Sequence, residues 1–252
     1  MIEIYAPSYK RAKGVKTHKI LPSVIYVVHE FEEHEYRAEG HKITVIPNDL
    51  RGNLSRVRNH IAQVLLKNGG IMIDDDIEDF KLWDFEDKSP FLKSMKAEDI
   101  LEFFEIAFVM AQEAGYKLFG VNIIGDKGSY REYTPLSFTN YISGSLMGII
   151  PNPILFDENL PLKEDYDYCL QHFNKYRGAL RFNYIHMIKK DHGNIGGCSD
   201  NRTIERECEQ MKLFQRKWGS KIVRLDNGKK KGKKKETIFD INPVIKVPIK
   251  GV

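Results

Sequence analysis

The sequence predicts a single α/β domain built on a mixed, mostly parallel β-sheet flanked by helices. Short apolar segments alternate with helical segments along the 252-residue chain, a pattern typical of sheets whose strands are connected by helices. Several apolar segments end in polar or acidic residues, and ligands of such folds bind at the carboxyl ends of the strands. Hydrophobic residues make up 42% of the sequence, which is enough for one sizeable core.

The first strands are expected at residues 1–6, 24–28 and 42–46. The first ends at Pro7 and leads into Ser8, Tyr9 and two basic residues. A strand that ends in a small polar residue and a basic loop suits a nucleotide site, although exposed lysine and arginine are usually only solvated. The second strand ends at His29 and Glu30. We expect the ligand site at this edge of the sheet.

A helix is expected after Gly52, because apolar residues recur there at helical spacing (positions 54, 57, 61, 64 and 65). Gly69 and Gly70 end this helix, and the next apolar strand follows at once. The helix carries Arg58 and Asn59. These two side chains therefore belong to the same helix–strand unit as the acidic residues that follow.

The apolar run 71–73 leads directly into Asp74, Asp75 and Asp76. Carboxylates held close together raise one another's pKa, so this placement favours a bound divalent cation or a shared proton. In an extended segment Asp74 and Asp76 project to one side and Asp75 to the other. An acidic cap of a short helix is the alternative. The spacing excludes an EF-hand, which needs glycine and glutamate at its sixth and twelfth positions.

A second group of candidates lies in the carboxyl-terminal half. A glycine-spaced strand is expected over 141–150, followed by an acidic helix start with Glu164, Asp165 and Asp167. Acidic residues are ordinary at a helix start because the helix dipole favours them, and Asp167 is best explained in this way. His192 begins a glycine-rich loop. A lone histidine is usually structural or solvated unless its surroundings make it a metal ligand.

The end of the chain differs in composition from the rest. We expect a domain over residues 1–227 and a lysine-rich run with a tail over residues 228–252. Residues 202–218 predict an exposed, charged helix, and six of the eight residues 228–235 are lysine. Such a run stays in solvent; it binds phosphate groups or serves only as a solubilising tail.

Cysteine usage and hydropathy predict a cytoplasmic protein. Cys169, Cys198 and Cys208 are odd in number and lack metal-binding spacing, so we expect reduced thiols. No apolar run approaches the ~20 residues that cross a bilayer, and the first residues do not resemble a signal peptide. A membrane partner is therefore not expected.

The order of these motifs resembles the nucleotide-sugar-binding half of GT-A (Rossmann-like) glycosyltransferases. The matching elements are a glycine, the pair Arg58–Asn59, a helix, a second glycine, an apolar strand and an Asp-x-Asp motif. The resemblance implies that Asp74 or Asp76 holds Mn²⁺ or Mg²⁺ on the diphosphate of a nucleotide sugar. It also implies that Arg58 and Asp75 belong to the donor site.

The same resemblance implies roles for two further segments near the donor. The loop after the first strand meets the uridine end of the donor in GT-A enzymes, which implicates Pro7, Ser8, Tyr9 and Arg11. An acidic residue after the second strand commonly faces the nucleobase, which implicates Glu30.

The acidic helix start resembles the GT-A motif that carries the catalytic base. In inverting enzymes the aspartate of this pair takes the proton from the acceptor hydroxyl, which implicates Glu164 and Asp165. In a retaining enzyme Asp165 would only orient the acceptor, and the sequence leaves both outcomes open. A late histidine often completes the metal shell, which implicates His192.

More narrowly, the chain resembles the TET-associated glycosyltransferases of bacteriophages, whose relatives include the glucosyltransferase of base J. This resemblance spans about residues 1–200. It implies transfer from a UDP-sugar to hydroxymethylcytosine or hydroxymethyluracil in DNA, in the cytoplasm of an infected host. The alternatives are a carbohydrate acceptor, such as a surface polymer, and an inactive DNA-binding relative.

Overall fold

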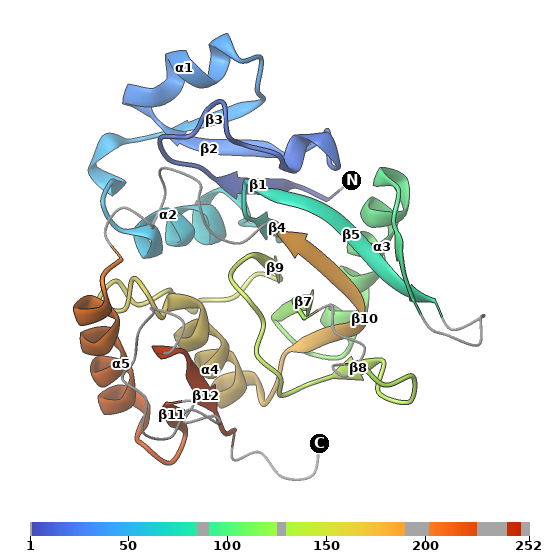
Figure 1. Ribbon diagram of the computed structural model, residues 1–252, viewed down its shortest axis with the longest axis vertical. Helices are drawn as coiled ribbons and strands as arrows, with labels where there is room; N and C mark the ends of the chain where they lie inside the picture. The colour runs from blue at the N-terminus through green and yellow to red at the C-terminus, as the bar shows by residue number, and fades with distance from the viewer. Residues whose placement is uncertain (1, 85–90, 125–129, 190–201, 226–240, 248–252) are drawn as a thin grey trace.

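The computed structural model describes residues 2–84, 91–124, 130–189, 202–225 and 241–247. Among these residues ten strands form one sheet in the order β3–β2–β1–β4–β9–β7–β10–β5–β6, with β8 paired to β10 (Figure 1). The strands are β1 (Ile4–Pro7), β2 (Ile25–His29), β3 (Ile43–Ile46), β4 (Gly70–Ile73), β5 (Ile77–Asp84), β6 (Phe91–Ser94), β7 (Leu118–Asn122), β8 (Leu136–Ser137), β9 (Leu146–Ile149) and β10 (Leu180–Lys189).

The sheet is mixed and mostly parallel, as predicted. Strands β1 to β4 are parallel, and β7 is parallel to β10. Strand β9 runs antiparallel between β4 and β7, while β5 runs antiparallel between β10 and β6. Among the ten described strands of this sheet only β5, β8 and β9 therefore oppose the common direction, and the carboxyl ends of β1, β2, β4 and β10 face the same way.

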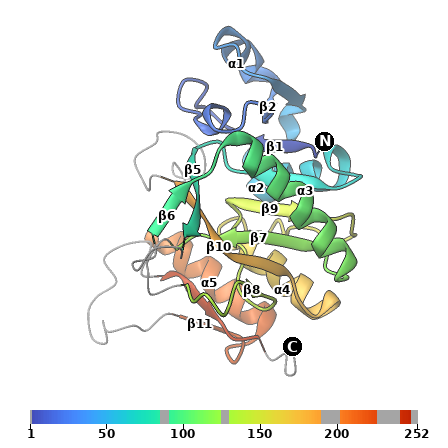
Figure 2. The same ribbon diagram turned by 90° about the vertical axis from the view of Figure 1, so that its right-hand side faces the viewer.

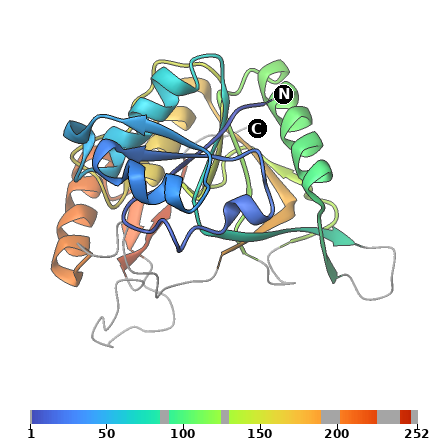
Figure 3. The same cartoon turned by 90° about the horizontal axis from the view of Figure 1, so that it is seen from above.

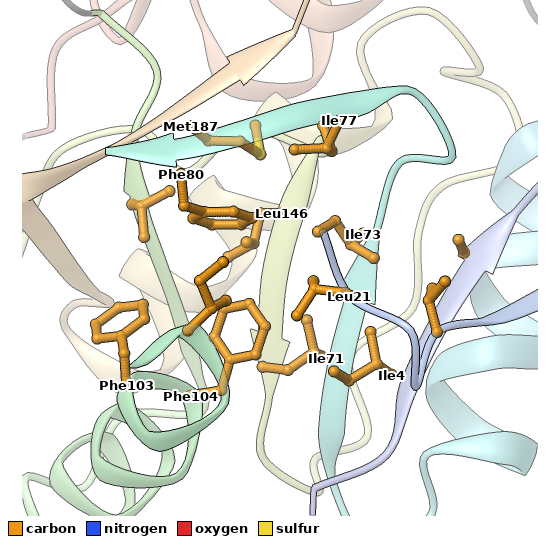
Figure 4. Packing of buried hydrophobic residues seen from close by; sticks show 14 of the residues in the cluster. Ile4, Leu21, Ile71, Ile73, Ile77, Phe80, Phe103, Phe104, Leu146 and Met187 are labelled. Carbon is orange, nitrogen blue, oxygen red and sulfur yellow. The ribbon is translucent and has the colours of Figure 1, made fainter. Parts of the chain in front are cut away.

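Helices cover both faces of the sheet. Helix α3 (Ala97–Glu113) covers one face, where Phe103 and Phe104 pack with Ile4, Ile71 and Phe80 (Figures 2 and 4). Figure 3 shows α3 on one side of the sheet and the other large helices opposite. These are α2 (Leu54–His60), α4 (Glu164–Tyr176) and α5 (Ile204–Trp218). The short helix α1 (Glu33–Ala38) lies beside β3.

Helix α2 begins and ends where the sequence predicts. The side chain of Asn53 caps it by accepting a hydrogen bond from the Ser55 amide (3.0 Å). The helix continues as a π-turn over Ile61–Leu65, and Gly69 follows with a φ of 88°. A Cβ atom at Gly69 would lie 2.6 Å from the ring of Phe108. Only glycine fits this turn, which brings the chain directly into β4.

Helix α5 differs from the expected exposed helix. One of its faces is buried against the layer that contains α4, and it includes Glu207, Gln210, Met211 and Phe214. Met211 and Phe214 are apolar. Glu207 carries a charge, and its burial is compensated by Lys163, whose ammonium lies 2.5 Å from the Glu207 carboxylate. Because Lys163 is 44 residues away from Glu207 in the sequence, the charge pattern of the helix alone does not reveal this partner and suggests solvent exposure.

The chain returns to the domain after the lysine-rich run, which lies outside the described residues. Strands β11 (Val223–Leu225) and β12 (Pro243–Ile245) form a small antiparallel sheet, and Ile241 is fully buried in the core. Cys169 and Cys208 are free thiols, while Cys198 is outside the described residues. Within the described parts of the chain, no helix has the length and apolarity to cross a membrane.

Candidate active site

The candidate site lies at the carboxyl edge of the sheet. Strands β1, β4 and β10 end there at Pro7, Ile73 and Lys189, close to the start of α4. Parallel strands place their following loops side by side. The structure therefore brings the β1 loop, the three aspartates and the acidic start of α4 together.

The carboxylate of Asp74 faces two cations. Its Oδ2 atom lies 2.7 Å from Lys189 Nζ, and its Oδ1 atom lies 3.7 Å from Arg58 Nη2. Burial acts to raise the pKa of Asp74, but Lys189 and Arg58 outweigh burial and hold that pKa below its usual value. Asp74 is therefore an ionised carboxylate at neutral pH.

Asp76 shares one of these cations. Its Oδ1 atom lies 3.4 Å from Lys189 Nζ, and its Oδ2 atom lies 3.5 Å from Arg11 Nη1. The Oδ1 atom is buried and accepts no hydrogen bond. Asp74 and Asp76 thus direct one oxygen each to the same ammonium group, while Asp75 points elsewhere.

Asp75 connects the β1 loop to the end of β4. Its carboxylate accepts a hydrogen bond from the hydroxyl of Ser8 and lies 3.1 Å from Arg11 Nη1. The Ser8 hydroxyl also lies 2.6 Å from the hydroxyl of Tyr36. Burial raises the pKa of Asp75 to about 6, although Arg11 and Ser8 act to lower it. These contacts fix the loop that carries Ser8 and Arg11.

The backbone of the aspartate segment is held by Thr17. Its hydroxyl donates to the carbonyl oxygen of Asp74 (2.7 Å) and accepts from the amide of Ile77 (3.0 Å). The amide of Lys16 donates to the carbonyl oxygen of Asp75 (2.7 Å). The carboxylates are therefore carried by a segment whose conformation is fixed by other parts of the chain.

Aromatic rings gather beside the β1 loop. The ring of Tyr9 makes edge contacts with the rings of His29 (5.8 Å) and Phe31 (6.0 Å). Glu30 is exposed here, whereas Glu32 is 2% exposed and accepts a hydrogen bond from the Lys10 amide. After β2 it is therefore Glu32, and not the predicted Glu30, whose carboxylate contacts the β1 loop.

Arg58 links the aspartates to the acidic start of α4. Its side chain is buried, with Nη2 facing Asp74 and Nη1 lying 3.7 Å from Glu164 Oε1. A Cβ atom at Gly144 would lie 2.1 Å from Nη1, so the absence of a side chain there leaves room for the guanidinium. Burial raises the pKa of Glu164 to about 8, with Arg58 acting against that rise.

Asp165 is half-buried and fixed by three donors. Its Oδ2 atom accepts hydrogen bonds from the hydroxyl of Tyr141 and from the amide of Gly144 (3.1 Å). Its Oδ1 atom accepts from the amide of Tyr166 (2.8 Å). The rings of Tyr141 and Tyr166 stack at 4.1 Å. Asp167 instead accepts a hydrogen bond from Trp218 Nε1 (2.7 Å) and is fully buried, which is a structural role.

Three residues of this site, Lys189, Thr17 and Tyr36, were not predicted from the sequence. One signal for Lys189 was present, because it ends an apolar strand just as Asp74 follows one. His192 lies outside the described residues. Across the described ranges no three histidine, cysteine, aspartate or glutamate side chains converge on a metal position, and Asp74 with Asp76 offers two carboxylates.

The fold and the site define an α/β protein with an acidic centre at the carboxyl edge of its sheet, beside a basic loop. The family model of the TET-associated glycosyltransferases matches residues 2–197, and the chain belongs to this family. The predicted glycosyltransferase activity and family are thereby confirmed. No curated protein matches the chain.

One of the solved structures similar to this chain is glucosyl-3-phosphoglycerate synthase from Mycobacterium tuberculosis, in complex with Mg²⁺ and uridine diphosphate. The two proteins share 9% sequence identity with a TM-score of 0.45. The similarity covers 77% of this chain and 72% of that chain.

Proposed function

We propose that this enzyme transfers a sugar from a UDP-sugar to the hydroxymethyl group of a modified pyrimidine in DNA, with a divalent metal ion as cofactor. One observation carries the proposal: Arg58 joins the cation-facing carboxylates Asp74 and Asp76 to the acidic pair Glu164–Asp165. In a TET-associated glycosyltransferase, this arrangement supports a donor site that directly adjoins the carboxylate that would take the proton of the acceptor hydroxyl.

The residues present suit Mg²⁺ or Mn²⁺. Carboxylate oxygens are preferred ligands of both ions. Asp74 and Asp76 direct oxygens to one cation, and Asp76 Oδ1 is buried without a hydrogen bond. These two side chains would hold the ion, and His192 stays a predicted third ligand. When bound, the ion supplies charge neutralisation for the departing nucleoside diphosphate.

The β1 loop is the proposed binding site for the uridine end of the donor. Ser8 and Arg11 are fixed by Asp75, and Tyr9 presents its ring beside Phe31, which is 44% exposed. Aromatic faces stack on nucleobases. A pre-ordered loop lowers the entropy that donor binding costs.

Asp165 is the proposed base in an inverting reaction. Tyr141 and Gly144 fix its carboxylate, so that it can accept the proton of a hydroxyl placed within hydrogen-bond reach. Glu164 lies next to it in the sequence and contacts Arg58, which supports a positioning role for Glu164.

Two observations support DNA as the acceptor, namely the family assignment and the lysine-rich run. Lysines 229–235 lie outside the described residues; we propose that they contact DNA phosphates without reading bases. The following test also includes a carbohydrate as a possible acceptor.

Purified enzyme should be assayed with a panel of UDP-sugars against hydroxymethylcytosine DNA, hydroxymethyluracil DNA, unmodified DNA and an oligosaccharide. We expect mass spectrometry of digested nucleosides to show a hexose on one modified base. Chelation with EDTA should abolish transfer, and added Mn²⁺ should restore it. Transfer to the oligosaccharide alone would reject the DNA acceptor, and full transfer after metal removal would reject the cofactor.

Replacement of the proposed base is the first prediction. Asp165→Asn should lower turnover by about 100-fold or more while donor affinity stays nearly unchanged. Initial rates and the binding of UDP measure the two effects separately. Asp167→Asn is a poor control because Asp167 accepts a hydrogen bond from Trp218 of α5, so Asp49→Asn, at an exposed position after β3, is preferred. Equal turnover in Asp165→Asn and wild type would leave Asp165 with a structural role.

A further inference from the structure

The inference concerns Lys189 and rests on the metal site of the proposed function. Lys189 is the last residue of β10, where the pairing with β5 shifts register next to Ile77. Its Nζ atom lies 2.7 Å from Asp74 Oδ2 and 3.4 Å from Asp76 Oδ1. The ammonium therefore lies between the two carboxylate oxygens that a divalent ion would use.

The remaining oxygens of the two carboxylates are directed to other cations. Asp74 Oδ1 faces Arg58, and Asp76 Oδ2 faces Arg11. Both arginines have further carboxylate contacts, with Glu164 and Asp75 respectively, which hold them in place. Lys189 differs because its two ion-pair contacts are the pair Asp74–Asp76 itself.

A metal ion and the ammonium cannot share this position. Mg²⁺ and Ca²⁺ ligand distances are about 2.0–2.6 Å, so an ion bound to Asp74 Oδ2 and Asp76 Oδ1 would occupy the space next to Lys189 Nζ. Two cations at that distance repel each other strongly in a partly buried site. Lys189 is able to leave, since its side chain is 31% exposed and is unbranched with a flexible stem.

We propose that the ammonium of Lys189 is the resident cation of the Asp74–Asp76 pair and that a divalent metal ion binds by displacing it. Lys189 neutralises the carboxylates while the metal is absent and competes with the metal for them. The displaced ammonium regains a partner when the diphosphate of the donor is bound. Metal and nucleotide therefore support each other's binding, and Lys189 is a positioning residue that couples them.

The test uses Mn²⁺ alone as the probe. The full chain, freed of metal, is titrated with Mn²⁺ by calorimetry or by electron paramagnetic resonance of the free ion. We expect Lys189→Met to bind Mn²⁺ about tenfold more tightly than wild type, a gain of roughly 1.4 kcal/mol. With UDP present the difference between the two proteins should shrink, because wild-type Lys189 then has the diphosphate as its partner.

Lys16→Met is the matched control. Lys16 pairs with Glu78 at 2.5 Å, and its side chain is 30% exposed, close to the value for Lys189. It removes one lysine near the same aspartate segment without touching Asp74 or Asp76. We expect its Mn²⁺ affinity to stay within about twofold of wild type, which would exclude a general effect of net charge.

The outcomes separate the exchange from the proposed function. The proposed displacement of Lys189 by the metal, called the exchange here, is overturned if Lys189→Met binds Mn²⁺ as tightly as wild type or more weakly. An equal gain in Lys16→Met overturns it too, as does absence of Mn²⁺ binding in every protein. If Lys189→Met folds poorly, Lys189→Gln with the thermal shift produced by Mn²⁺ gives the same comparison. Sugar transfer by wild type with no gain in Lys189→Met rejects the exchange alone. A gain without transfer to any acceptor rejects the proposed function alone.

Discussion

Lys163 and Lys189 both contact carboxylates, but they do so in opposite surroundings. Lys163 and Glu207 form an ion pair at 2.5 Å in which both side chains are completely buried. Lys189 contacts Asp74 and Asp76 at the sheet edge with 31% of its side chain exposed. The first pair has no access to a competing ion, whereas the second lies where a competing ion can arrive. Access to solvent thus separates an ion pair that holds the fold from one that can exchange.

The buried pair lies beside the candidate active site, at the start of α4. Lys163 directly precedes Glu164 and Asp165, and Glu207 lies on α5. Arg202 also contacts Glu207, so that the carboxylate has two cationic partners. Helix α5 follows the residues that match the family, yet it fixes the backbone that carries the proposed base.

The largest effect in this comparison is expected from breaking the buried pair. Glu207→Ala leaves the ammonium of Lys163 buried without its partner, which should cost about 3–5 kcal/mol of unfolding free energy. Urea denaturation measures the loss. Glu209→Ala, at an exposed position of the same helix, should change stability by about 0.5 kcal/mol or less.

A double variant shows whether that loss comes from the unpaired charge. Lys163→Met with Glu207→Leu removes both charges and should recover most of the stability. A double variant as unstable as Glu207→Ala would mean that packing around α5, and not the uncompensated ammonium, sets the cost.

The stability of the buried region around α4 should also depend on pH. His172 on α4 is fully buried, and burial lowers its pKa to about 4 from 6.5. The unfolded chain therefore binds a proton more readily than the folded one, so stability is complete above pH 6.5 and falls as the pH decreases toward 4. The full loss is roughly 3 kcal/mol.

Urea denaturation between pH 4 and pH 7 tests this dependence. His172→Gln should flatten the pH dependence of stability, while His34→Gln, at an exposed position, should leave it unchanged. A pH dependence that persists in His172→Gln would assign the acid sensitivity to other groups.

The smallest effect on stability is expected at Lys189. A partly exposed ion pair contributes about 0–1 kcal/mol, and Asp74 and Asp76 keep Arg58 and Arg11 as partners. Lys189→Met should therefore lower the unfolding free energy by about 1 kcal/mol or less in metal-free buffer. A loss as large as that of Glu207→Ala would make Lys189 a fixed part of the fold and would remove the contrast between the two lysines.

The features predicted correctly from the sequence depend on neighbouring residues. The strand that ends in Asp74–Asp76, the helix that carries Arg58 and the glycines that end it all lie within one short segment. Spacing and turn residues are sufficient for such elements because their causes are local.

The features that were missed depend on residues far apart in the sequence. Lys189 is 115 positions from Asp74, and Ser8 is 67 positions from Asp75. Whether α5 is exposed depended on Lys163, 44 positions from Glu207. A local pattern predicts which side chains reach the edge of the sheet, but it does not predict which opposite charge meets them there.

The position of β10 in the sheet has a consequence for the order in which the chain is synthesised. This strand lies between β7 and β5, although it is the last strand of the large sheet to leave the ribosome. Until residue 189 has emerged, the hairpin of β5 and β6 lacks its neighbour and Asp74 lacks its nearest ammonium. Domains generally fold as units during synthesis. The amino-terminal half of this enzyme therefore completes neither its sheet nor its acidic centre until the carboxyl-terminal half joins it.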